Sequence, residues 1–156
     1  MNYQILKEID TIEAITAWHS IANKVVDEEN RESNAMKLVL EEYREMMEAY
    51  MGDSDKDHIM HEIADLIFVL VNLIYVHGYS PASVLRTVTE SNYTKFFNKL
   101  HYNTFKDKID KHCEEKDLVV TNVNAEVMCV TDKDYKIKKG IFYQPVKYKQ
   151  FVKLDV

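Results

Sequence analysis

Residues 38–49 read LVLEEYREMMEA and residues 56–76 read KDHIMHEIADLIFVLVNLIYV. Apolar side chains recur every three or four positions in the first stretch, and the second is apolar on nearly every side between Ile63 and Val76. These patterns predict two long helices, the second of them the central helix of a bundle. Acidic residues interrupt both patterns on faces that should be buried, so the same two helices carry the candidate functional site.

Two more helices are predicted, one before this pair and one after it. Asp10, with Glu13 three residues later, forms a capping box at the start of the first. Ser80 followed by Pro81 starts the last, which is expected to extend to about Leu100. The expected inward-facing side chains are Ile15, Trp18, Ala22 and Val25 in the first helix and Val84, Leu85, Val88 and Phe96 in the last.

The pattern changes after about Asp117. Short β-branched or aromatic runs, separated by polar turns, occupy residues 118–120, 127–130 and 141–143, and residues 132–140 form a charged loop. These runs predict short strands. The predicted fold class is therefore all-α, a four- to five-helix bundle with a small β-rich C-terminal appendage.

A chain of 156 residues fits one domain. We expect a helical catalytic core over residues 1–105 and a β-rich extension over 117–156, too short for a core of its own. The formal net charge is −6, and the seven lysines and three aspartates after residue 131 add +4, which leaves −10 for residues 1–131. This balance argues against a nucleic-acid polymer as partner.

The cysteines and the hydrophobic segments bear on the compartment. Cys113 and Cys129 form no CxxC motif, so we expect free thiols in a reducing compartment, with a disulfide as the less favoured alternative. The N-terminal stretch MNYQILKEID is too polar for a signal peptide. The apolar run from Ile63 to Val76 is too short to span a bilayer. We therefore predict a cytoplasmic protein without a membrane partner.

Carboxylates occupy the expected buried face of both long helices. On the first, Glu42 lies within the apolar stripe and Glu45 lies at its edge, three residues on. On the second, Glu62 and Asp65 show the same spacing. The two faces comprise Ala35, Val39, Glu42, Met46 and Ala49 on the first helix and His58, His61, Glu62, Asp65, Val69 and Asn72 on the second.

Four clustered carboxylates, with no lysine or arginine beside them, would repel one another and would be costly to bury. A divalent cation removes both problems, and oxygen-only ligands favour Mg²⁺, or Mn²⁺ as a substitute, over zinc. The alternative is that the acids are a solvated face and helix caps. His58 and His61 are more typical of surface or capping groups than of ligands. Di-iron bundles need Glu-x-x-His motifs and His–Asp phosphohydrolases need an adjacent His-Asp pair, and the chain has neither.

The acidic pattern resembles the signature of the all-α NTP pyrophosphatase superfamily, which includes MazG proteins, dimeric dUTPases and phosphoribosyl-ATP pyrophosphohydrolases. The resemblance rests on Glu41-Glu42-x-x-Glu45, a gap of sixteen residues, and Glu62-x-x-Asp65. Residues 88–96 (VTESNYTKF) and 138–145 (KKGIFYQP) are also similar to segments of short phage and bacterial MazG-like proteins. The resemblance covers residues 10–100 and the short tail segment.

This resemblance implies a magnesium-dependent enzyme, a homodimer or homotetramer, that cleaves a nucleotide between its α- and β-phosphates and releases pyrophosphate. The implied metal ligands are Glu42, Glu45, Glu62 and Asp65, and the implied catalytic residues are Glu41, Glu42 and Glu45. Glu41 would be an outer ligand or would orient the attacking water. The implied substrate contacts are Ser91, Asn92 and Lys95. The alternatives are a non-catalytic nucleotide sensor or regulator on the same fold, and a purely structural helical protein.

Overall fold

The computed structural model describes residues 10–155, which divide into two compact units. The first, called the helical unit below, comprises residues 10–84 and 149–155. The second, called the mixed unit, comprises residues 85–148. The chain thus leaves the helical unit once and returns to it at its C-terminal end. The single-domain organisation stays a prediction.

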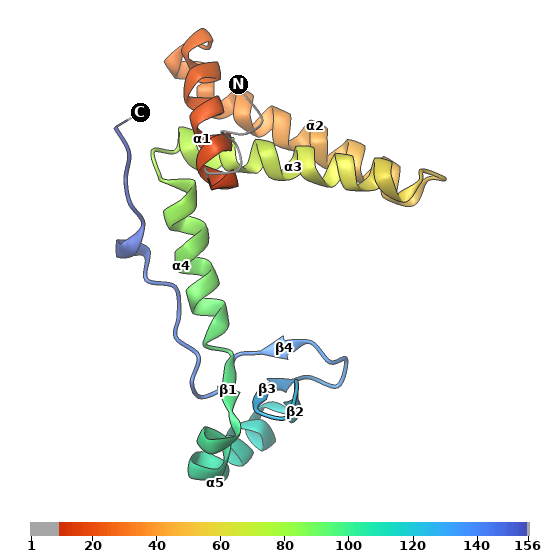
Figure 1. Ribbon diagram of the computed structural model, residues 1–156, viewed down its shortest axis with the longest axis vertical. Helices are drawn as coiled ribbons and strands as arrows, with labels where there is room; N and C mark the ends of the chain where they lie inside the picture. Colours follow the sequence, from red (N-terminus) through yellow and green to blue (C-terminus); the bar gives the residue numbers. More distant parts are fainter. Residues whose placement is uncertain (1–9, 156) are drawn as a thin grey trace. The chain divides into compact units, whose positions relative to one another are not determined.

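The helical unit is built on an antiparallel helix pair. It contains α1 (Thr11–Ala22), α2 (Arg31–Met51) and α3 (Lys56–Val76), with α2 alongside α3 and α1 packed on α3 (Figure 1). Short 3₁₀ turns at Asn23–Val25 and Glu28–Asn30 lead from α1 to α2. The two long helices of the sequence prediction are therefore confirmed.

Local hydrogen bonds define the helix ends. The Asp10 carboxylate accepts a hydrogen bond from the Ile12 amide at 3.0 Å, and the Asp55 carboxylate accepts one from the His58 amide at 2.8 Å. The amide of Gly52 donates to the carbonyl of Glu48 at 3.0 Å at the end of α2. A Cβ at position 52 would lie 2.9 Å from that carbonyl oxygen, so a glycine fits this helix end.

The buried face of α1 differs from the predicted one. Trp18 is 51% exposed and Val25 is 89% exposed, whereas His19 and Asn23 are buried against α3. The predicted inward direction of Trp18 and Val25 is wrong. The physical reason is that His19 and Asn23 both find hydrogen-bond partners on α3, at the Phe68 carbonyl and the Asn72 side chain. The hydrogen bonds that these polar groups make with water in the unfolded chain are thus replaced when they are buried.

Helix α3 is long and apolar enough to cross a membrane by length and composition alone, with a mean hydropathy of 1.9 over its most apolar window. This is weak evidence, because the core helix of a water-soluble protein passes the same test. Here α3 packs on α1 and α2 and carries Glu62 and Asp65. Met60, Ile67 and Leu70 on the same helix stay exposed.

Helix α4 (Pro81–Tyr93) begins as predicted, with the Ser80 hydroxyl accepting a hydrogen bond from the Ser83 amide at 3.3 Å. It ends at Tyr93 and not near Leu100, because the amides of Thr94 and Lys95 turn back to carbonyls three residues earlier. The predicted place of Phe96 inside this helix is therefore wrong. Phe96 instead begins a strand.

The mixed unit is a small antiparallel sheet covered by one helix. Its strands are β1 (Phe96–Asn98), β2 (Val119–Asn122), β3 (Val127–Thr131) and β4 (Ile137–Lys138), in the order β1-β3-β2 with β4 also paired to β3. Helix α5 (Lys99–Lys116) packs against these strands, as Figure 1 shows. The unit has its own buried cluster, made of Phe97, Ile109, Cys113, Met128 and Val130.

Two predicted features of this region were placed differently. The run 141–143 forms a turn and not a strand, with the Phe142 ring packed 5.5 Å from the Phe97 ring. Within the charged segment 132–140, residues 137–138 form β4. The fold class itself, an all-α fold with a small β-rich C-terminal part, is confirmed, with five α-helices between residues 10 and 155.

The C-terminal residues complete the helical unit. The Ser80 amide donates to the Val152 carbonyl, and the Leu154 amide donates to the Gly78 carbonyl, each at 2.8 Å. Gly78 has a φ of 76°, a left-handed conformation that glycine adopts without steric cost. The chain reverses at this glycine between α3 and α4. The C-terminal segment hydrogen-bonds to the residues of this turn.

Candidate functional site

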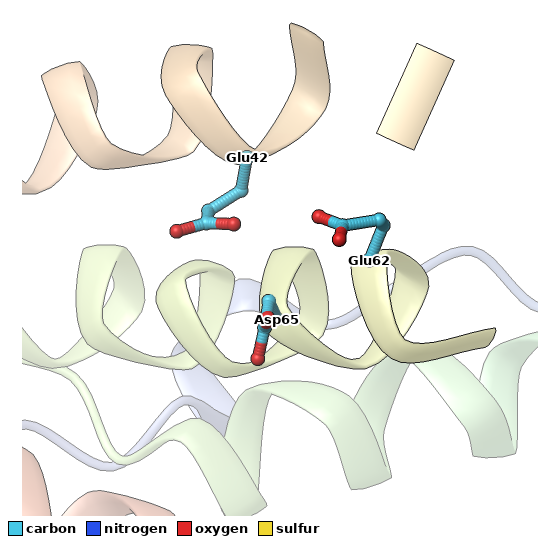
Figure 2. Close-up of side chains that lie close together, drawn as sticks. All are labelled: Glu42, Glu62 and Asp65. Carbon is cyan, nitrogen blue, oxygen red and sulfur yellow. The ribbon is translucent and has the colours of Figure 1, made fainter. Parts of the chain in front are cut away.

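Glu42 on α2 and Glu62 and Asp65 on α3 bring three carboxylates together. One oxygen from each lies within 4.8 Å of the other two. Figure 2 shows Glu42 reaching from α2 toward α3, where Glu62 and Asp65 lie one helical turn apart. The three residues, called the acidic cluster below, all belong to the helical unit. They are three of the four ligands expected from the sequence.

Local sequence explains this convergence. Glu62 and Asp65 are three residues apart, so their side chains leave α3 on the same side. Glu42 lies on the side of α2 that also carries Ala35 and Ala49, which are 1% and 4% exposed. These small residues let the two helices approach closely. The acid of α2 is therefore held against the two acids of α3.

The acidic cluster concentrates negative charge in a partly buried place. Glu62 is buried, with 8% of its surface exposed, and Glu42 and Asp65 are partly buried. Burial raises the pKa of the Glu42 carboxyl above its usual range, and the charge of Asp65 raises it further. Weaker contributions come from Glu45, Glu41 and Glu62. Negative charge thus accumulates at one place, which a divalent cation would neutralise.

The donor set fits magnesium or manganese. All three groups offer carboxylate oxygens, the donors that hard divalent cations prefer. Two histidines lie at the edge of the acidic cluster: His58 Nδ1 is 3.5 Å from Glu62 Oε1, and His61 Nε2 is 3.2 Å from Asp65 Oδ2. Each lies four residues before its acid, a spacing visible in the sequence. The sequence predicts that these histidines are surface or capping groups. Their side chains are 53% and 69% exposed, which agrees with this prediction.

Glu45 and Glu41 lie outside the acidic cluster but near it, because both raise the pKa of Glu42 by their charge. Contrary to the expectation that no basic residue lies beside the acids, Arg44 is 3.8 Å from Glu45 and 3.7 Å from Glu48. The side chain of Glu45 is therefore turned toward a basic neighbour in this structure. Its role as a ligand, and the catalytic roles of Glu41, Glu42 and Glu45, stay predictions.

The predicted substrate contacts Ser91, Asn92 and Lys95 lie in the mixed unit. Ser91 is buried, and its hydroxyl donates to the Gln144 carbonyl at 2.7 Å. The Asn92 amide donates to the Val88 carbonyl of its own helix at 3.1 Å and is exposed. Lys95 is partly buried. Their contact with a nucleotide stays a prediction.

Comparison with known proteins gives one match. The family model of phosphoribosyl-ATP pyrophosphohydrolase matches residues 18–92. No match was found among curated proteins or among solved structures. The matched range contains all three residues of the acidic cluster, together with Glu41 and Glu45.

Proposed function

Through residues 18–92 the chain belongs to the MazG-like all-α NTP pyrophosphatase superfamily, and on that premise we propose that it is a magnesium-dependent nucleotide pyrophosphohydrolase. The family implies a pyrophosphohydrolase of nucleotides in general. The finer proposal is cleavage of an NTP, a dNTP or a related nucleotide between the α- and β-phosphates, giving a nucleoside monophosphate and pyrophosphate. The convergence of Glu42, Glu62 and Asp65 carries this proposal.

The acidic cluster supplies what this hydrolysis requires. Its carboxylates would hold magnesium, which neutralises phosphate charge and lowers the pKa of bound water when it is present. A carboxylate beside the metal would accept a proton from the attacking water, and Glu41, Glu42 and Glu45 are the predicted groups. Glu62 and Asp65, on a helix packed against α2, fix the position of the donor oxygens.

A direct test measures pyrophosphate release from a panel of NTPs, dNTPs and phosphoribosyl-ATP, with magnesium and manganese compared. We expect turnover with at least one nucleotide and loss of turnover in EDTA. The matched control is Glu48→Gln on the same helix, because Glu48 is exposed and outside the acidic cluster. Tight magnesium-dependent binding with no turnover of any nucleotide would contradict the enzyme and support the alternative, a nucleotide sensor.

We further propose that the protein works as a homodimer or homotetramer in the cytoplasm. Supporting this, large apolar side chains on all three helices of the helical unit are exposed in the single chain, and exposed apolar patches mark protein–protein interfaces. They include Ile21 on α1, Leu40 and Tyr43 on α2, and Ile67 and Leu70 on α3. Analytical ultracentrifugation tests the assembly, and a monomer at micromolar concentration would refute it.

A further inference from the structure

The mixed unit contains a pocket of about 660 Å³ with a basic lining. Four lysines, Lys95, Lys116, Lys138 and Lys139, line it, and His112 joins them. We call it the basic pocket. Leu118, Ile137 and Gly140 complete its wall. All these residues belong to the mixed unit. Each of them also lies after residue 92, where the range matched by the family model ends.

The charge of this pocket is largely uncompensated. Lys138 pairs with Asp132 at 2.9 Å, but within residues 10–155 no carboxylate forms a salt bridge with Lys95, Lys116 or Lys139. Two other lysines of α5 do have acidic partners: Lys106 pairs with Asp110, and Lys111 with Glu115. In a chain with a net charge of −6, three lysines without a carboxylate partner in a salt bridge among the described residues thus line one pocket.

The positive charge of the lysines also affects the neighbouring Tyr143. The Lys139 ammonium lies over the Tyr143 ring, 4.8 Å from its centroid. The pKa of Tyr143 lies below its usual value, first because of a hydrogen bond with Ser91 and then because of the charges of Lys139 and Lys95. An anion in the basic pocket would gain from the same charges.

Two of the lysines belong to segments that are anchored to the rest of the mixed unit. Lys116 ends α5, whose inner face buries Ile109 and Cys113 in the unit's core. Lys139 follows β4, and its backbone carbonyl lies 3.1 Å from His112 Nε2 on α5. A Cβ at Gly140 would lie 3.3 Å from Val130 Cγ2, so the segment runs close to β3. The backbone that carries each of the two lysines is therefore anchored to the rest of the mixed unit.

We propose that the basic pocket binds a small polyphosphate anion, carried by a nucleoside triphosphate or present as inorganic polyphosphate, and that it does so without metal. Several lysine ammonium groups in a concave site match the charge density of linked phosphates. The volume is in the range of pockets for small ligands. Lys106 and Lys111, on the same helix as Lys116, are paired with acids and do not extend the basic lining into a longer track, which disfavours a nucleic-acid backbone as the ligand.

The test is isothermal titration calorimetry with inorganic tripolyphosphate and, separately, with a nucleoside triphosphate, both in EDTA. Without metal the acidic cluster cannot hold phosphates, so binding reports the basic pocket. The test variant is Lys116→Gln with Lys139→Gln, which leaves Lys95 and the acidic cluster intact. The matched control is Lys108→Gln with Lys111→Gln, two exposed lysines of α5 outside the pocket with the same change of net charge.

We expect the test variant to bind tripolyphosphate about tenfold or more weakly, the scale of lost charge-assisted contacts. The control pair and Glu62→Gln should bind as the wild type does, and affinity should fall with salt. Tighter binding of the triphosphate than of tripolyphosphate identifies a nucleotide as the source, and equal binding identifies inorganic polyphosphate.

Three results would overturn the proposal. The first is no binding of either probe by the wild type. The second is equal affinity in the test and control pairs. The third is a single-stranded oligonucleotide that binds through the same lysines more tightly than tripolyphosphate. If circular dichroism shows that the double variant is unfolded, the single variants Lys116→Gln and Lys139→Gln are titrated in its place. Binding that persists in Glu62→Gln while turnover is lost separates this proposal from the proposed activity.

Discussion

The side-chain amide of Asn23 donates a hydrogen bond to Oδ1 of Asn72 at 2.8 Å, and both residues are buried. The same Asn23 amide group also donates to the His19 carbonyl at 2.9 Å. This pair joins the end of α1 to the C-terminal part of α3 through groups that are largely shielded from water. Their hydrogen bonds make the burial of two amides tolerable.

Asn72→Ala is expected to destabilise the helical unit by about 1–3 kcal/mol, because the Asn23 amide loses one of its two acceptors inside the protein. Urea unfolding followed by Trp18 fluorescence measures this, since Trp18 is the sole tryptophan and its ring packs 5.0 Å from Phe68. The control Asn103→Ala, at an exposed position, should change stability by less than about 0.5 kcal/mol. Equal losses in the two variants would contradict the role of the pair.

Asp65→Asn and Glu45→Gln are each expected to lower turnover at least about a hundredfold, the scale of lost metal electrostatics. Asp65 belongs to the acidic cluster, whereas Glu45 lies outside it. Steady-state kinetics with the best substrate of the panel, alongside Glu48→Gln, makes the measurement. Near wild-type turnover in Glu45→Gln alone would leave a site of three acids.

Magnesium should stabilise the protein, because it binds the folded acidic cluster and not the unfolded chain. At a concentration a hundred times its Kd the gain is about 2.7 kcal/mol. Glu62→Gln should reduce the rise in Tm on adding magnesium, measured by calorimetry. In EDTA the same variant should be neutral or stabilising, since it relieves repulsion among the three carboxylates. If magnesium raised the Tm of Glu62→Gln as much as that of the wild type, the metal would bind at another site.

His19 should make stability depend on pH. Burial lowers the pKa of His19 below the usual histidine value of about 6.5, so in the folded state the ring resists protonation, while the unfolded chain takes up the proton. The free energy of unfolding should therefore fall as pH drops below about 6.5, and it should be insensitive to His19 above that. Urea titrations from pH 7.5 to 5 test this. His19→Gln should flatten the slope, whereas exposed His77→Gln should not.

Both cysteines should be unreactive in the folded protein. Burial raises the pKa of the Cys113 and Cys129 thiols, and the charge of Asp110 adds to the effect at Cys113. Both are free and buried. A thiol reagent at pH 8 should modify neither within the time in which it modifies both in denaturant. Rapid modification of the native protein would place at least one thiol in contact with solvent.

The long helix pair and its acids could be predicted because local periodicity determines both. Glu42, Glu62 and Asp65 disturb an otherwise apolar face, and this disturbance is visible in single helices. The predicted face of α1 was wrong because Trp18 is the more hydrophobic residue, while His19 and Asn23 are the ones that find partners on α3. Hydrogen bonding between elements distant in sequence decided that orientation.

The mixed unit was harder to predict for the same reason. Helix α5 is rich in lysine and has no strong apolar stripe, so only its packing on the sheet reveals its inner face. Strand β1 is three residues long and exists through its pairing with β3. The basic pocket joins residues as far apart as Lys95 and Lys139, which no local pattern connects.

The return of residues 149–155 to the helical unit has a consequence for biosynthesis. Residues 10–84 are synthesised before the segment that hydrogen-bonds to Ser80 and Gly78. The acidic cluster lies within 31–76, so it can assemble on the nascent chain. The hydrogen bonds of Gly78 and Ser80 with residues 152–154 can form only after the whole mixed unit has been translated, so they form later in synthesis than the helix pair can.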